Sequence, residues 1–184
     1  MPLWGASTSD ESKPKNLTAE EKSRVFADTR GWVITRPDGK EEVLVAIRNL
    51  SGGAGTDKLG EATISSIYFG ANSYSTGTTG SVYVNWNEKV SKTATPTLLV
   101  RATTLAAATS NLTASYAAGI GTNTLRFDFT VPSATGTVLT LLTQTISGTI
   151  TDAGSTNAAD KSITTAKVVG AALDGGSTSV TTTV

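Results

Sequence analysis

The chain of 184 residues contains no histidine and no cysteine, and these absences remove much of the usual catalytic and metal-binding chemistry. Without cysteine there is no disulfide framework and no thiolate metal site. Without histidine, a serine nucleophile has no imidazole base beside it. Positive and negative formal charges cancel, so no overall field would draw the chain to nucleic acid or to acidic lipid. We therefore expect a protein that is not an enzyme and that has no metal site and no cofactor.

Long apolar segments and aromatic residues are also scarce. No apolar run approaches the ~20 residues that a membrane span requires, and aromatic residues make up 6% of the chain. The N-terminal sequence MPLWGASTSDESKPK has neither the basic region nor the apolar region of a signal peptide. We expect a product of a cytoplasm that binds neither membrane nor nucleic acid.

The composition changes along the chain and predicts a division into two parts. Residues 1–60 hold more than half of the charged residues, whereas residues 61–184 hold most of the threonines. The glycine-rich sequence SGGAGTDKLG lies between them. The expected organisation is an N-terminal attachment segment over residues 1–50, a linker over residues 51–60 and a β-sandwich over residues 61–184.

The N-terminal segment predicts an extended arm, a short helix and a hairpin. Residues 1–17 are polar and aperiodic. Thr18 and Glu21 have the spacing of a capping box and favour a helix over residues 19–27. Strand-like runs over residues 32–36 and 42–48 flank Pro-Asp-Gly-Lys, and Asp-Gly is a strong hairpin signal because such turns need positive φ.

The second part of the chain is a series of short strand-like runs separated by turn residues. In LRFDFTV, Leu125, Phe127 and Phe129 share one face, and Arg126 and Asp128 share the other. Similar runs without helix signals between them favour a mainly β fold, a β-sandwich. The expected strands cover residues 62–69, 81–86, 97–103, 112–116, 124–131, 137–143, 161–169 and 177–183.

The carboxylates were candidates for chemistry, but their settings favour simpler roles. Asp128 and Glu88 lie at strand positions where a solvated face is the expected environment. Asp152, Asp160 and Asp174 lie in Gly/Ser/Thr-rich sequence and could offer oxygen ligands to calcium. The D-x-D-x-D spacing of a calcium loop is absent, which favours turn roles for all three.

Trp4 is unusual because it stands in an otherwise polar, aperiodic arm. One interpretation packs it against the protein's own domain. The other makes it an anchor in the pocket of a partner, a position in which tryptophan is enriched. The sequence leaves both open.

Two stretches carry a family resemblance. The sequence LWGASTSDESKPKNLTAEEKSRVFADTRGWVI, with Trp4-Gly5 and Arg30-Gly31-Trp32, resembles the N-terminus of small virion structural proteins of marine tailed phages that infect cyanobacteria. The sequences VYVNWNEKVSKTATPTLLV, ASYAAGIGTNTLRFDFTV and GTITDAGSTNAA resemble an immunoglobulin-like repeat of large surface proteins and phage structural proteins. The sequence departs from the repeat at Thr93-Ala94-Thr95 and after Asp160.

The resemblance implies a non-enzymatic structural protein of the virion. The expected role is that of a capsid decoration or cement protein on the capsid exterior. There the chain would bind the lattice of the major capsid protein, or other virion subunits. Self-association on the lattice would add further contacts. The residues expected to bind the partner are Trp4, Lys13, Pro14, Lys15, Arg30 and Trp32. The alternatives are a tail or neck component, and an adhesion or glycan-binding module whose aromatic platform would use Tyr68, Tyr74 and Tyr83.

Overall fold

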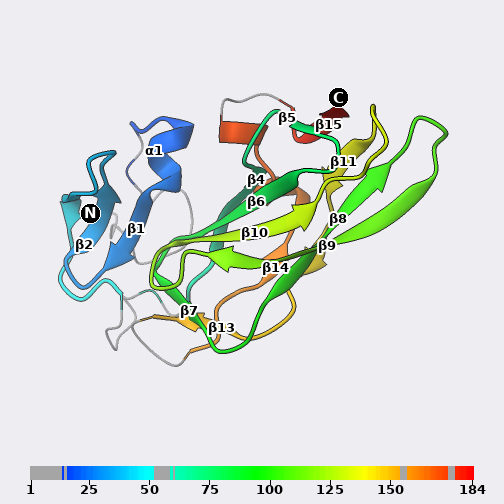
Figure 1. Cartoon of the computed structure of the whole chain (residues 1–184). Coiled ribbons are helices and arrows are strands. Elements are labelled where there is room, and N and C mark those ends of the chain that lie inside the picture. The colour runs from blue at the N-terminus through cyan, green and yellow to red at the C-terminus, as the bar shows by residue number, and fades with distance from the viewer. Residues whose placement is uncertain (1–13, 15, 52–58, 60, 154–156, 174–176) are drawn as a thin grey trace.

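The computed structural model describes residues 14, 16–51, 59, 61–153, 157–173 and 177–184, and the statements that follow concern these residues. They form a mainly β protein with one short α-helix (Figure 1). A small three-stranded sheet and the helix lie at one end, and the larger sandwich-like body extends away from them (Figure 1). The expected mainly β, sandwich-like architecture is confirmed.

The three-stranded sheet contains the predicted hairpin. Strands β2 (Gly31–Thr35) and β3 (Glu41–Ala46) pair antiparallel, and Gly39 in the turn between them has a φ of 81°. Strand β1 (Val25–Asp28) pairs with the other edge of β2. We call α1, these three strands and the segment through Ser51 the N-terminal unit.

The helix is shorter than the sequence predicted. Helix α1 covers Ala19–Ser23 and has the expected capping box, but residues 25–28 form a strand instead of its last turn. Val25, Phe26 and Ala27 are buried, and the Ala27 amide donates a 2.7 Å hydrogen bond to the Asn87 carbonyl. A β-branched and an aromatic residue favour a strand, and here the tertiary pairing overrides the weak local helix signal.

The sandwich is built mainly from one long sheet. Its order is β4-β6-β10-β9-β8-β11-β15-β5, antiparallel except for the parallel pair of β15 and β5. Two short pairs, β12-β14 and β13-β7, complete the described strands. The bounds are β4 Ile64–Phe69, β5 Ser73–Ser75, β6 Thr79–Trp86, β7 Val90–Lys92, β8 Thr97–Thr103, β9 Thr109–Ala118, β10 Thr124–Thr130, β11 Val138–Leu141, β12 Gln144–Thr145, β13 Ile150–Asp152, β14 Ser162–Ile163 and β15 Ser179–Thr183.

The alternation read from the sequence correctly identified the buried face of β10. Leu125, Phe127 and Phe129 are 0%, 0% and 3% exposed and belong to the main hydrophobic core. The intervening Arg126 and Asp128 face outward and form an ion pair of 3.1 Å. The loop between β9 and β10 is the glycine-containing hairpin that the sequence predicted.

Several strand predictions were too long, and some strands were missed. The run over residues 161–169 is a two-residue strand, β14, followed by a 3₁₀ turn, Thr165–Lys167. The run over residues 137–143 ends as β11 at Leu141, and β12 then pairs elsewhere. The missed strands β5, β7 and β13 are three residues long and β12 is two, too short for an alternating pattern to identify.

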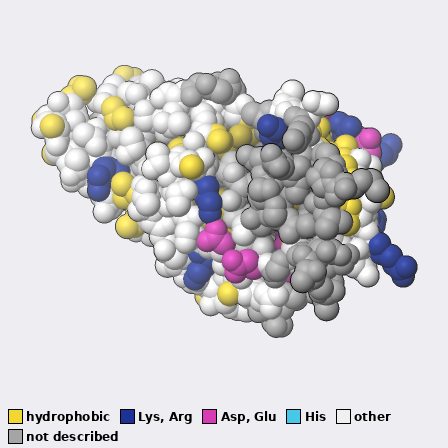
Figure 2. Space-filling model, turned by 180° about the vertical axis from the view of Figure 1, so that it is seen from behind, with side chains coloured by type: hydrophobic (Ala, Val, Ile, Leu, Met, Phe, Trp, Pro, Cys, Tyr) yellow, Lys and Arg dark blue, Asp and Glu magenta, His cyan; other side chains and the backbone are white. Residues whose placement is uncertain are grey.

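Two separate hydrophobic clusters occupy the two parts of the chain. The larger contains buried residues from Ala62 to Val180, and the smaller contains Val25, Ala27, Trp32, Ile34, Leu50 and Leu59. The predicted linker is described only at Ser51 and Leu59; both are buried, and Leu59 belongs to the smaller cluster. In the view of Figure 2, uncharged side chains predominate at the end of the sandwich that lies away from the N-terminal unit.

Candidate functional site

The residues predicted to bind a partner fall into three groups in the structure. Trp4, Lys13 and Lys15 lie outside the described residues. Pro14 is half-buried shortly before α1. The remaining two, Arg30 and Trp32, belong to the loop between β1 and β2 and to β2 itself.

Arg30 is exposed but already engaged within the N-terminal unit. Its Nε and Nη2 atoms donate to Asp28 Oδ2 at 2.8 and 2.5 Å, and Nη2 also pairs with Glu41. The hydrogen bonds with Asp28, and then with Glu41, raise the pKa of the Arg30 guanidinium above its usual range. Nearly half of the Arg30 side chain remains exposed, at 46%, so it can still meet a partner.

Trp32 has no surface to offer a partner. Its side chain is 0% exposed and lies in the smaller hydrophobic cluster with Ile34 and Leu50. Trp32 and Ile34 share the face of β2 that packs in this cluster, so Trp32 helps to hold the three-stranded sheet together. The sequence pattern Arg-Gly-Trp identified a structurally important residue, but the structure assigns it to packing.

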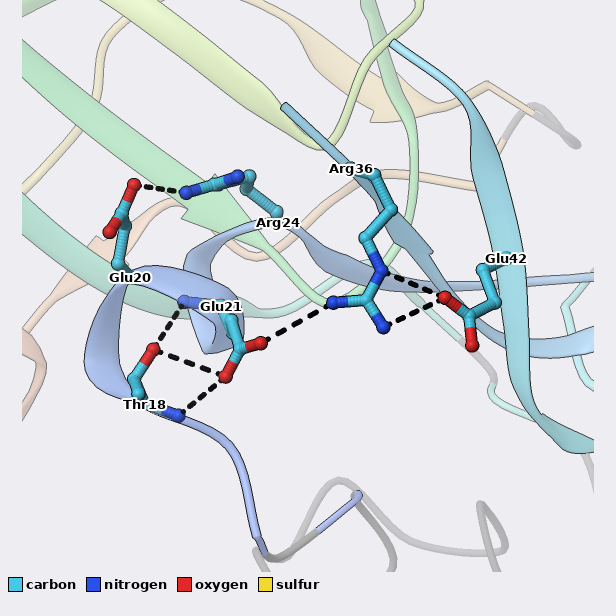
Figure 3. Close-up of polar contacts among 6 residues, drawn as sticks. All are labelled: Thr18, Glu20, Glu21, Arg24, Arg36 and Glu42. Atoms are coloured by element: carbon cyan, nitrogen blue, oxygen red, sulfur yellow. Dashed lines mark hydrogen bonds and ion pairs between the residues drawn. The ribbon is translucent and has the colours of Figure 1, made fainter. Parts of the chain in front are cut away.

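A chain of polar contacts fastens α1 to the hairpin (Figure 3). The Glu21 amide donates to Thr18 Oγ1 at 3.2 Å, and the Thr18 amide donates to Glu21 Oε2 at 3.0 Å. Arg36 reaches from the end of β2 to Glu21 at 3.4 Å and donates through Nε to Glu42 of β3 at 2.8 Å. The Thr18 backbone hydrogen bond first, and then Thr18 Oγ1 and Arg36, lower the pKa of Glu21, so Glu21 is ionised at neutral pH.

The N-terminal unit is joined to the sandwich along the segment that follows β6. We call this contact region the junction. Besides the Ala27–Asn87 backbone hydrogen bond, Lys89 Nζ forms a 2.9 Å ion pair with Glu41 and lies 4.7 Å from the centre of the Phe26 ring. On the other side of the junction, Asn123 Nδ2 donates to the Ser23 carbonyl at 2.9 Å.

Glu88 corrects the expectation of a solvated carboxylate. It is 1% exposed, and the Ser51 hydroxyl donates a hydrogen bond to its Oε2 atom. Burial is the main cause that raises the pKa of Glu88, to about 7; the Ser51 hydroxyl opposes this shift and the nearby Asp152 charge adds to it. The alternation of Val82, Val84 and Trp86, extended by one step, puts residue 88 on the buried side, so the sequence does contain a signal for the burial of Glu88.

The tyrosines named for a glycan platform do not form one surface. Tyr74 is 8% exposed and packs edge-on against Phe69 and Phe129, so it belongs to the core. Tyr68 and Tyr83 lie opposite each other on β4 and β6 and stack with ring centres 5.4 Å apart. Such a cross-strand aromatic pair stabilises a sheet in its own right.

The aspartates of the later loops take structural roles where they are described. Asp160 accepts from the Ser162 amide at 2.8 Å and pairs with Lys167 at 2.6 Å. Burial works to raise the pKa of Asp160, but Lys167 and Ser162 hold it below its ordinary value. Asp152 is 4% exposed at the end of β13, and Asp174 lies outside the described residues.

The described residues contain no group of three or more His, Cys, Asp or Glu side chains that could hold a metal ion. Within the same part of the chain, no helix is long and apolar enough to cross a membrane. The chain matches no protein-family model, no curated protein and no solved structure.

Proposed function

We propose that this chain is a non-enzymatic structural protein of a phage virion, a decoration or cement protein that binds the outer surface of the capsid lattice through its N-terminal segment. The sequence resemblance over residues 3–34 suggests this role. The structural observation that supports it best is the separate hydrophobic cluster of the N-terminal unit, which lies beside the sandwich core and not within it.

A separate, internally packed unit suits attachment. The capped helix and the hairpin are cross-linked by Arg36, and the unit is fastened to the sandwich by Lys89 and Asn123. Its own contacts therefore fix Thr18, the N-cap of α1, relative to the sandwich. A partner that holds residues 1–17 would hold the sandwich too, and repetition over a lattice would add up modest contacts.

The test is to locate the protein in the parent particle. Mass spectrometry of purified virions should give a copy number that matches the capsid lattice, and cryo-electron microscopy should show residues 1–51 in contact with capsid subunits. Absence from virions would overturn the proposal. Density confined to the tail or neck would replace the head assignment with the tail alternative.

A further inference from the structure

The junction between the N-terminal unit and the sandwich is concentrated around one buried carboxyl group. Asn87, Glu88 and Lys89 each contact the N-terminal unit, through Ala27, Ser51 and Glu41 respectively. Glu88 is the central member of this run, and Ala27 is also its parallel bridge partner. A change in the charge of Glu88 would therefore act on the segment that makes most of the described contacts between the N-terminal unit and the sandwich.

The surroundings of Glu88 suit a neutral carboxyl better than a carboxylate. The Ser51 hydroxyl donates to Oε2, whereas the buried Oε1 atom has no hydrogen-bond partner among the described residues. Its chain neighbour Lys89 is directed to Glu41 and to the Phe26 ring instead. A buried carboxylate without a cation is costly, and burial favours its protonated form.

Among the residues that the structure describes, no charged group around the junction forms an ion pair with Glu88. From the N-terminal sheet, Asp28 and Glu41 face Arg30 and are paired with it, and Glu41 also pairs with Lys89. The buried Asp152 of β13 lies across from Val90 of β7 in the strand register, and its negative charge acts on Glu88. Burial and Asp152 raise the pKa of Glu88 to about 7, with Ser51 opposing.

We propose that Glu88 is a protonation-controlled latch between the N-terminal unit and the sandwich. The neutral carboxyl stays buried against Ser51 and keeps the junction closed. Loss of the proton leaves a buried negative charge beside Asp152, which hydration can relieve only if the junction opens. The chain has no histidine or cysteine, the side chains whose ordinary pKa values lie nearest to neutral pH. This inference does not depend on the proposed virion role.

Amide hydrogen exchange of the full-length protein, followed by NMR, tests the latch. The Ala27 amide reports on the junction because it donates to Asn87, and the Val131 amide reports on the sandwich because it donates to Thr78. With a carboxyl pKa of 4.5 when open and about 7 when closed, the opening constant at Ala27 should rise roughly tenfold between about pH 6 and pH 8, after correction for intrinsic exchange. The opening constant at Val131 should stay unchanged.

Two variants and a matched control complete the test. Glu88→Gln keeps the shape of the neutral acid and should abolish the rise at Ala27. Asp128→Asn removes a carboxylate from the outward face of β10 and should leave the rise intact. Ser51→Ala removes the hydroxyl that favours the carboxylate, so the midpoint of the rise should move to higher pH.

The latch is refuted if Glu88→Gln shows the same tenfold rise, or if Val131 follows Ala27 in step. Should Glu88→Gln fold poorly, the Ser51→Ala midpoint decides the matter. A midpoint that moves upward supports the latch, and a midpoint that stays in place contradicts it.

Discussion

Phe129 offers the sharpest test of the sandwich core. Its side chain is 3% exposed on β10, and its ring makes edge-on contacts with Phe69 and Tyr74 at centre distances of 6.3 and 5.8 Å. Gly80 on the paired strand β6 lies directly beneath the ring: a methyl group there would come within 2.4 Å of the Phe129 ring. The Phe129 ring therefore packs against two aromatic rings and against the β6 backbone at Gly80.

Phe129→Ala should lower the free energy of unfolding by about 3–5 kcal/mol. Burial of the removed ring atoms and the cavity left behind account for most of this loss. The two edge-on aromatic contacts add about 0.5–1.5 kcal/mol each in favourable cases, which places Phe129 toward the upper end of the range. Phe127→Ala, at a position that is 0% exposed, should fall in the same range.

Chemical denaturation with two independent probes measures these values. Arg126→Ala is the matched control, because this side chain is 42% exposed on the outward face and its ion pair with Asp128 is a surface contact. We expect the control, and likewise Asp128→Ala, to stay within about 0.5 kcal/mol of the wild type. A larger loss for the outward residues than for the two phenylalanines would refute the assigned orientation of β10.

Three further predictions concern the two parts of the chain. The fragment of residues 61–184 should melt cooperatively by itself, since it contains the whole larger cluster; a broad melt with exposed apolar surface would refute the predicted boundary. Because the pKa of Glu88 is raised in the folded state, its contribution to the free energy of unfolding should be present below about pH 4.5 and be lost as the pH rises through about 7. At about pH 8, chemical denaturation should show Glu88→Gln to be more stable than the wild type by up to roughly 3 kcal/mol, and the absence of any gain would refute the conclusion that the Glu88 charge is uncompensated. Gly31→Ala should lower the free energy of unfolding of the N-terminal unit by at least about 1–3 kcal/mol, because Gly31 has a φ of 125° and a methyl group there would lie 2.1 Å from the Val45 carbonyl oxygen. Hydrogen exchange of the Leu59 amide should accelerate while that of the Val131 amide does not, and equal acceleration at both amides would contradict a local effect.

The sequence predicted those elements whose signals are local. The alternation in β10, the Asp-Gly hairpin and the Thr18–Glu21 capping box all depend on neighbouring residues, and the structure confirms each of them. The elements that it missed depend on distant partners. Strand β5 pairs with β15, far along the chain, and β13 pairs with β7. Strand β1 is the exception, because its ladder partner β2 is close in the sequence.

The junction could not be derived from local patterns for the same reason. Ser51 stood in a glycine-rich stretch that predicted a linker, and Glu88 stood beside Lys89 in a pattern typical of a solvated strand end. Their contact joins residues 37 positions apart. Only the alternation of β6 contained a hint that Glu88 turns inward.

Binding to virions stripped of this protein tests whether the chain attaches through its N-terminal segment. Full-length protein should restore wild-type occupancy, measured by quantitative mass spectrometry of sedimented particles. A chain that lacks residues 1–17, and the Trp4→Ala variant, should bind at sharply reduced occupancy, since a buried tryptophan anchor can contribute about 2 kcal/mol or more. Tyr83→Ala, which alters the outward face of β6, should bind as the wild type does. Wild-type occupancy of the truncated chain, or loss of binding in Tyr83→Ala alone, would contradict the account and place the attachment on the sandwich.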